Sequence, residues 1–108
     1  MILFPFSLGF SIISADWSKL EPSQVIFPRR SGHASLVSNG TTFVFGGYVE
    51  EDTDDEMKPY RRRVVNDLWK WDKNTWSLQQ CTGEIPGPRL ATAIETIQSK
   101  AYLFGGWD

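Results

Sequence analysis

The sequence predicts an all-β protein built from a repeated unit of short antiparallel strands, and three observations support this prediction. Apolar residues occur in short runs separated by turn-forming residues, a pattern typical of strands. Nine Gly and six Pro stand beside a 14% aromatic content, which favours short strands and tight turns over helices. The chain also matches itself when shifted by 59 positions, and a period of this size indicates stacked or radial repeats.

The shift of 59 positions superimposes residue types that rarely coincide by chance, including Trp, Arg and a pair of Gly. The matched positions are Trp17-Ser18 with Trp76-Ser77, Arg30 with Arg89, Ala34 with Ala93, Phe45 with Phe104, and Gly46-Gly47 with Gly105-Gly106. Several matches at one offset define the alignment of the units. We therefore predict the end of one unit at 17–29, a nearly complete unit at 30–80, and the first half of the next at 89–108.

The nearly complete unit opens with two predicted strands. The first strand covers 34–37, and Ser38-Asn39-Gly40 supplies its turn because Asn and Gly tolerate the positive φ that tight hairpins require. The second covers 42–45, which is rich in β-branched and aromatic residues, and it is expected to end at Gly46-Gly47.

Two further strands complete the unit, and the next unit begins in the same way. A third run covers 64–71 and a fourth covers 75–80, with Asp72-Lys73-Asn74 as the turn between them. The runs 91–97 and 101–104 then repeat the first hairpin. We expect four antiparallel strands followed by a second, partial unit.

Charge and the scarcity of Cys and His argue against several classes of function. The net charge of −2 gives no basic face for nucleic acid, so no nucleic-acid partner is expected. Cys81 is the single cysteine and His33 the single histidine, so neither an internal disulfide nor a Cys/His zinc site is expected within this chain. Neither residue has an assignable catalytic neighbour, and we expect no catalytic residue, metal or cofactor.

Residues 1–16 are placed outside the repeat. The first fifteen residues carry no charge and are mostly apolar, a length too short to span a bilayer, so no transmembrane segment is expected. The length suits the apolar part of a signal peptide, and Ser14-Ala15 supplies small residues for cleavage, although the usual basic start is absent. The alternatives are a buried strand or extraneous sequence. A cytoplasmic or nuclear location is expected, with secretion if this segment is a signal peptide.

The order of these motifs resembles a Kelch repeat. The resemblance rests on Arg30-Ser31-Gly32-His33-Ala34, Phe43-Val44-Phe45-Gly46-Gly47, Asn66-Asp67-Leu68-Trp69 and Trp76, in that order, and it covers 17–107. Three departures accompany it: Trp71 stands where the family usually has Tyr, the turn from Trp71 to Trp76 is about one or two residues shorter than usual, and Gly32-His33 becomes Ala91-Thr92 in the second unit. The resemblance implies four-stranded blades of a partial β-propeller, with further blades needed to close a ring.

Three functional hypotheses follow from the resemblance. It implies a non-catalytic scaffold that binds a protein partner through inter-strand loops, as in family members that deliver substrates to ubiquitin ligases or bind the cytoskeleton. Some Kelch propellers are instead copper oxidases or act in glucosinolate breakdown, which is the enzyme alternative. The third alternative is a truncated chain without independent activity, because a closed propeller needs at least about four blades.

Most of the recognisable residues are interpreted as structural. Because a blade packs both faces against its neighbours, Phe45, Trp76 and each of the other Trp residues are expected in the core. The diglycines are expected to permit an unusual backbone angle and close approach between blades. Arg30 and Arg89 are expected to donate hydrogen bonds inside the propeller. The landmark positions are Arg30, Gly46, Gly47, Asn66, Asp67, Trp69, Trp76, Arg89, Gly105 and Gly106.

The segment between the second and third predicted strands is the unusual one. Residues 50–56 hold six acids, and Lys58-Pro59-Tyr60-Arg61-Arg62-Arg63 then reverses the sign. The segment lacks the glycine and the terminal Glu that an EF-hand calcium loop requires, which argues against a calcium site. The other interpretations are a solvated, partly disordered loop and a partner-binding loop. For a partner-binding loop, the expected contact residues are Tyr48, Tyr60, Arg61, Arg62 and Arg63, because Tyr and Arg are enriched at binding hot spots.

Overall fold

The computed structural model describes residues 16–20 and 25–108, and these residues form antiparallel strands only. The strands are β1 (Arg30–Ser31), β2 (Ala34–Ser38), β3 (Thr41–Asp52), β4 (Tyr60–Asp72), β5 (Thr75–Gln79), β6 (Ala93–Ile97) and β7 (Lys100–Phe104). The all-β prediction is confirmed. The described part of the chain contains no helix that could cross a membrane.

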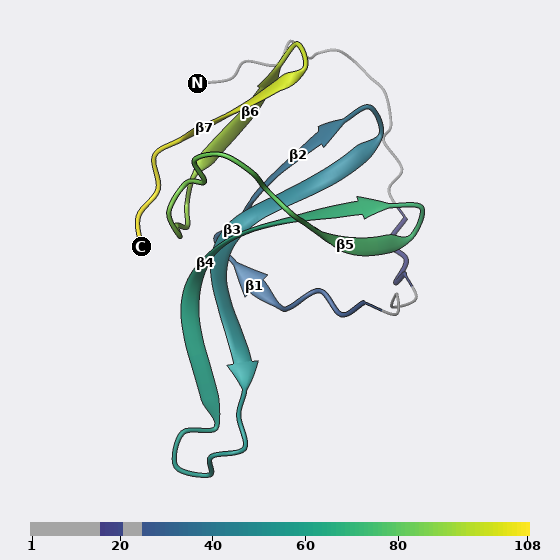
Figure 1. Cartoon of the computed structure of the whole chain (residues 1–108). Helices are drawn as coiled ribbons and strands as arrows, with labels where there is room; N and C mark the ends of the chain where they lie inside the picture. Colours follow the sequence, from purple (N-terminus) through teal and green to yellow (C-terminus); the bar gives the residue numbers. More distant parts are fainter. Residues whose placement is uncertain (1–15, 21–24) are drawn as a thin grey trace, which may run out of the picture.

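The first sheet is a four-stranded blade with one short addition. Strands β2, β3, β4 and β5 pair in sequence order, and β1 pairs with the far half of β3, so that β1 and β2 lie along the same edge of β3 (Figure 1). Asn39 and Gly40 turn the first hairpin with φ of 50° and 78°, the positive angles that a two-residue hairpin turn requires. Strands β6 and β7 form a separate two-stranded sheet that repeats the hairpin of β2 and β3.

Two strand boundaries differ from the prediction by four residues or more. Strand β3 does not end at Gly46-Gly47 but continues to Asp52, and β4 begins at Tyr60 instead of at Val64. Cross-strand pairing persists because the acidic run on β3 lies opposite the basic run on β4, so opposite charges face each other along the ribbon. The expected loop is therefore a two-stranded arm (Gly47–Asp52 of β3 and Tyr60–Val65 of β4), which projects from the blade (Figure 1), with only 53–59 outside the strands.

A β-bulge separates the blade from the arm. Phe45 pairs with Leu68 and Gly47 pairs with Val65, so that Gly46 alone faces both Asn66 and Asp67. Such a bulge bends the strand and changes the direction in which side chains point. The same two strands, β3 and β4, thus form the centre of the blade before the bulge and the arm beyond it.

The core runs from the centre of the blade into the base of the arm. Its buried apolar residues are Ala34, Val44, Phe45, Val49, Val65 and Trp69. One face, which carries Leu36, Phe43 and Leu68, meets Ile94 and Leu103 of the β6–β7 hairpin across a cleft of about 450 Å³. The β6–β7 hairpin therefore sits where a neighbouring blade is expected.

The stretch that precedes the blade contains no strand in its described part, 16–20 and 25–29. Trp17 is almost fully exposed, whereas Trp76, its match at the offset of 59, lies in β5 and stacks on Phe27. The assignment of 17–29 to the end of a blade stays a prediction. The apolar segment 1–15 lies outside the described residues.

Candidate functional site

The arm divides the expected binding residues between its two faces. Residues directly opposite each other in an antiparallel pair share a face, and successive residues alternate. The register therefore puts Val49, Glu51, Arg61 and Arg63 on one face, and Tyr48, Glu50, Asp52, Tyr60, Arg62 and Val64 on the other. The five predicted contact residues do not form a single patch.

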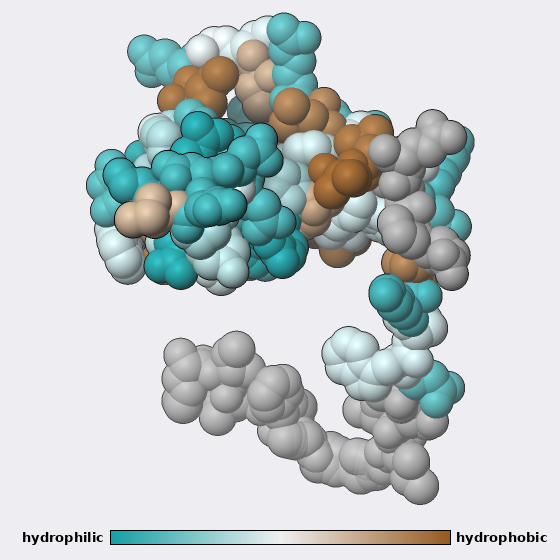
Figure 2. Space-filling model, turned by 90° about the horizontal axis from the view of Figure 1, so that it is seen from below, coloured by the Kyte–Doolittle hydropathy of each residue, from teal (hydrophilic) through white to brown (hydrophobic). Residues whose placement is uncertain are grey.

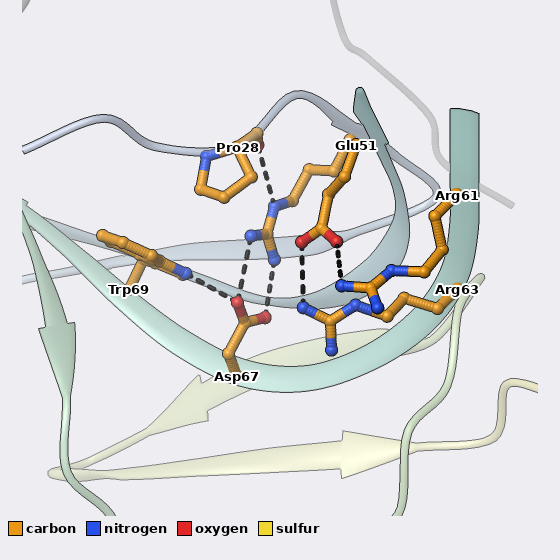
Figure 3. Close-up of polar contacts among 7 residues, drawn as sticks. Pro28, Glu51, Arg61, Arg63, Asp67 and Trp69 are labelled. Atoms are coloured by element: carbon orange, nitrogen blue, oxygen red, sulfur yellow. Dashed lines mark hydrogen bonds and ion pairs between the residues drawn. The ribbon is translucent and has the colours of Figure 1, made fainter. Parts of the chain in front are cut away.

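On the first face, Glu51 binds two arginines at once. Its Oε2 accepts a hydrogen bond from Arg61 Nη2 at 2.9 Å, and its Oε1 accepts one from Arg63 Nη2 at 2.9 Å (Figure 3). The hydrogen bonds from Arg63 and then from Arg61 lower the pKa of the Glu51 carboxyl below its ordinary value, and the bond to Glu51 raises the pKa of Arg63. Glu51 already engages both arginines of this face, although its one negative charge balances only one of their two positive charges.

The second face is less occupied. Arg62 makes one ion pair, from its Nε to Glu50 Oε2 at 3.3 Å, and Arg29 reaches Asp52 at 3.5 Å. Tyr60 is exposed at the outer end, and Tyr48 is half-buried near the blade. An aromatic ring and a singly paired arginine are thus available to a partner on this face.

The arm ends in an ordered turn. Thr53 N donates to the Pro59 carbonyl at 2.9 Å, and Asp55 Oδ1 accepts from Met57 N at 2.9 Å. Met57 is 88% exposed beside acidic residues. Within the described residues, no group of three or more His, Cys, Asp or Glu side chains is placed to hold a metal ion.

Seen from the end that carries the arm, the molecule presents a mainly hydrophilic surface, with hydrophobic residues grouped beside it (Figure 2). The paired charges of the arm account for much of this polarity.

At the base of the arm, Arg30 fastens the segment before the blade to β4. Its Nη1 and Nη2 donate to the two carboxylate oxygens of Asp67 at 2.7 and 3.0 Å, and its side chain is only 1% exposed. Further hydrogen bonds run from Nη1 to the Gly46 carbonyl at 3.0 Å and from Nε to the Pro28 carbonyl at 3.3 Å. This two-pronged contact is the strongest form of arginine pairing, and we refer to Arg30 and Asp67 as the arginine lock.

Trp69 and Phe27 complete the arginine lock. Trp69 Nε1 donates to Asp67 at 2.7 Å (Figure 3), and the guanidinium of Arg30 lies 4.6 Å from the centre of the Phe27 ring. Partial burial is the largest influence on Asp67 and opposes its ionisation, but the hydrogen bonds from Arg30 and Trp69 outweigh it, and the pKa of Asp67 is lowered. Asp67 is therefore an anionic structural partner of Arg30.

Because of the bulge, the side chains of Asn66 and Asp67 bind two different segments of the chain. Asp67 binds Arg30 of its own unit, whereas Asn66 Nδ2 donates to the carbonyl of Pro86, in the segment that leads to the next unit, at 2.9 Å. The extra residue in β4 thereby lets neighbouring side chains hold the segment before β1 and the segment that leads to the next unit.

The two glycines of Gly46-Gly47 make room for two different segments. A Cβ on Gly46, where φ is +68°, would lie 2.7 Å from the Arg89 carbonyl oxygen, and one on Gly47, where φ is +102°, would lie 2.8 Å from the Ser31 carbonyl oxygen. Gly47 N also donates to Arg89 O at 3.0 Å, and Arg89 N donates to Val65 O at 3.2 Å. The absence of a side chain at Gly46 leaves room for the backbone of Arg89, and its absence at Gly47 leaves room for the backbone of Ser31.

A family profile described as the KLHDC2/KLHL20/DRC7 Kelch-repeats domain matches residues 7–108. The chain belongs to the Kelch-repeat family. The blade formed by β2 to β5 is thus a Kelch blade, and the chain forms part of a β-propeller.

Similar curated proteins are much longer than this Kelch chain. Kelch domain-containing protein 1 of Homo sapiens is 30% identical over 81 residues, which cover 73% of this chain and 19% of that protein. Kelch domain-containing protein 3 of Bos taurus is 28% identical over 109 residues, covering 92% of this chain and 26% of that protein. The Rho GTPase-activating protein gacHH of Dictyostelium discoideum is 32% identical over 81 residues, covering 73% of this chain and 5% of that protein.

Sequence reasoning missed one component of this Kelch blade, the aromatic contact before β1. Phe27 stacks on Trp76 with ring centroids 4.0 Å apart and meets Trp69 edge-on at 5.5 Å. The offset of 59 gave no sign of Phe27 because it aligns that residue with Pro86. The ion pairs of the arm could have been found by aligning 50–51 antiparallel to 61–62, since opposite charges then coincide.

Proposed function

We propose that this Kelch chain is part of a non-catalytic protein-interaction scaffold and that the arm contacts the partner. The observation that supports this proposal is the continuous pairing of β3 with β4 beyond the bulge, from Gly47 opposite Val65 to Asp52 opposite Tyr60. Segments that project from a rigid β scaffold commonly carry recognition. A paired ribbon also loses less conformational entropy on binding than a free loop does.

Within the arm, the face that carries Tyr60 and Arg62 is the proposed contact surface. Arg61 and Arg63 share the carboxylate of Glu51, so their recruitment by a partner would require two hydrogen bonds to break. Arg62 has one longer contact and Tyr60 is exposed. Tyr and Arg side chains supply a large share of binding energy at interfaces. Tyr48 lies on the same face, nearer the blade, and is expected to extend the contact surface.

The first experiment removes the arm while keeping the blade. Val49 pairs with Arg63, so a two-residue Asn-Gly turn in place of Glu50 to Arg62 joins two residues that are already opposite each other. Quantitative affinity purification from cell extract would compare the wild-type chain with this deletion variant. We expect at least one protein captured by the wild-type chain to be lost.

A face-specific pair of variants then tests the assignment. The Tyr60→Ser, Arg62→Gln variant should lower the affinity of the purified partner at least tenfold, as loss of hot-spot contacts does. The matched control, Arg61→Gln with Arg63→Gln, removes the same type of charge from the opposite face and should change affinity less than threefold, as changes outside a hot spot typically do. Retention of every partner by the deletion variant would refute the role of the arm.

A further inference from the structure

The outer edge of β4 is open along the arm. Strand β5 pairs with β4 only from Leu68 to Asp72. The part of β4 that forms the arm therefore has β3 on one side and no strand among the described residues on the other (Figure 1). An edge strand presents a row of unpaired N–H and C=O groups, and such a row is a template for a further strand.

This open edge is bounded at both ends. Towards the blade, Arg89 N donates to the Val65 carbonyl at 3.2 Å and Asn66 Nδ2 donates to the Pro86 carbonyl at 2.9 Å, so the chain that follows β5 lies against β4 there. At the far end, the turn 53–59 closes the arm. The stretch between these limits, 60–64, spans about 17 Å of extended chain, which is the usual length of a strand. We call it the arm edge.

The direction of the arm edge keeps it clear of neighbouring blades. In a propeller the blades pack against one another through the faces of their sheets. The arm edge lies on the side of β4 that carries β5 in the blade, and not on a face. A strand could add here whether or not other blades cover the faces of the sheet.

Three consecutive arginines make the arm edge basic. Arg61, Arg62 and Arg63 follow one another on β4, and their carboxylate partners all lie on β3, the opposite side. Opposite charges that face each other stabilise a strand pair, whereas like charges destabilise it. The arm edge therefore favours an acidic strand and disfavours β4 of a second copy.

Arg62 has the groups that would hold the acid. Its one side-chain bond within the described residues runs from Nε to Glu50 Oε2 at 3.3 Å, so its two terminal NH2 groups have no acceptor. The side chain is 58% exposed, and these two groups match the two oxygens of a carboxylate. Tyr60 lies on the same face of the arm and is exposed, so it can pair with an apolar residue of the added strand.

The acid must come from outside the arm. Each acid on β3 of the arm already has an arginine partner, and the pairs are Glu50 with Arg62, Glu51 with Arg61 and Arg63, and Asp52 with Arg29. A second copy that offered its own β3 would have to break these pairs before it could bind. A strand from a different protein brings an unpaired carboxylate.

We propose that the arm binds a segment of a different protein, which adds to the arm edge as an extended antiparallel strand with an acidic residue opposite Arg62 and an apolar residue opposite Tyr60. This inference rests on the proposed role of the arm and specifies how the partner binds. Main-chain hydrogen bonds supply the affinity and alternate side chains the specificity, as in other cases of strand addition. Antiparallel pairing is the more stable arrangement, and it makes the recognised pattern acidic, any residue, apolar, in chain order.

A two-dimensional NMR titration of the isotope-labelled chain tests this binding mode with a defined probe. The probe is a capped synthetic peptide, Thr-Val-Thr-Glu-Thr-Phe-Thr, which places Glu opposite Arg62 when Phe lies opposite Tyr60. We expect it to shift the amide signals of 60–64 and to leave those of β6 and β7 in place. The same peptide with Gln instead of Glu should bind at least about threefold more weakly, the modest effect expected of an exposed charge pair.

Methylation of the peptide backbone separates strand addition from attraction between charges alone. Successive amides of a strand point to opposite sides, so only one alternating set can donate to β4. Two N-methylated peptides, one for each set, keep the same charge. One should lose detectable binding, while the other should bind within about threefold of the parent peptide, because it keeps its hydrogen bonds to β4. Equal effects of the two methylated sets would overturn the proposal.

Variants of the chain assign the acidic preference to one arginine. Arg62→Gln should bind the Glu and Gln peptides equally, because the groups that hold the carboxylate are gone. The matched control, Arg61→Gln, removes the same charge from the opposite face and should keep the preference. A preference for the Glu peptide that persists in Arg62→Gln would overturn the assignment.

The outcomes also separate this inference from the role of the arm itself. If the arm deletion loses a captured protein but the peptide leaves 60–64 unshifted, strand addition is wrong and the arm remains a contact surface. If the deletion retains every protein, the role of the arm is refuted, and this inference with it. Sedimentation that shows dimers from which the peptide is excluded would overturn the proposal in favour of a second copy.

Discussion

The arginine lock makes Asp67→Asn the most informative single change in the blade. The Arg30 side chain is 1% exposed and Asp67 is its carboxylate partner, through bonds of 2.7 and 3.0 Å. Asparagine keeps the shape of the side chain but presents one carbonyl oxygen and one NH2 group to three donors, two from Arg30 and one from Trp69. The guanidinium would stay buried while at least one donor lost its acceptor.

The expected cost follows from the burial of the two partners. Removal of one member of a fully buried ion pair typically costs about 3–5 kcal/mol. The Asp67 side chain is 27% exposed, so water can partly replace the lost carboxylate, and we expect a decrease of about 2–3 kcal/mol in the free energy of unfolding. Glu51→Gln is the control, because its exposed pairs on the arm should contribute at most about 1 kcal/mol.

Urea denaturation followed by tryptophan fluorescence measures both variants, since Trp69 and Trp76 report on the blade. A decrease for Asp67→Asn that does not exceed the decrease for Glu51→Gln would refute the reasoning. The dependence on pH provides a second readout. Because the pKa of Asp67 in the folded chain lies below its ordinary value of 3.8, its contribution to stability is present above that value and is lost as the pH falls below it. Asp67→Asn should lack this component of the acid-induced loss.

Two further predictions concern the contacts around the lock. Gly46→Ala and Gly105→Ala both place a side chain at positive φ, +68° and +77°, a strain of about 1–2 kcal/mol, but only the first also meets a carbonyl oxygen at 2.7 Å. Thermal unfolding should show Gly46→Ala to be the more destabilising by at least about 1 kcal/mol, and equal melting temperatures would contradict the role given to the first glycine. Phe27→Ala should cost about 2–3 kcal/mol and alter the near-ultraviolet circular dichroism of Trp76, because a half-buried ring stacked at 4.0 Å is removed. A loss smaller than about 0.5 kcal/mol, the range of ordinary surface substitutions, would show that this contact does not hold the preceding segment.

Apolar runs and turn chemistry were sufficient to predict the four strands that form the blade. Asn39-Gly40 adopts the positive φ values that its sequence indicates, and β2 and β5 lie within one residue of their predicted ends. These elements are set by local preferences, which a single sequence expresses directly. The repeat offset then identified Arg89 and Gly106 as counterparts of Arg30 and Gly47 before their contacts were known.

The arm could not be predicted in the same way because its stability depends on pairing between runs of opposite charge. Taken singly, the runs 50–52 and 61–63 have the composition of solvated loop. Only their antiparallel register brings Glu51 opposite Arg61 and Glu50 opposite Arg62. The division of the expected contact residues between two faces is likewise a consequence of strand alternation, which becomes visible only after the register is known.

The bond from Gly47 to the Arg89 carbonyl, and the space that Gly46 leaves for it, have a consequence for cooperativity. The blade formed by β2 to β5 contributes part of the surface on which the segment around Arg89 rests, so its folding free energy includes a nearest-neighbour term from the next unit. A substitution in the diglycine should therefore loosen the following blade as well as its own. Hydrogen exchange would register the defect on both sides of the junction, and the chain would melt as a linked array instead of as independent modules.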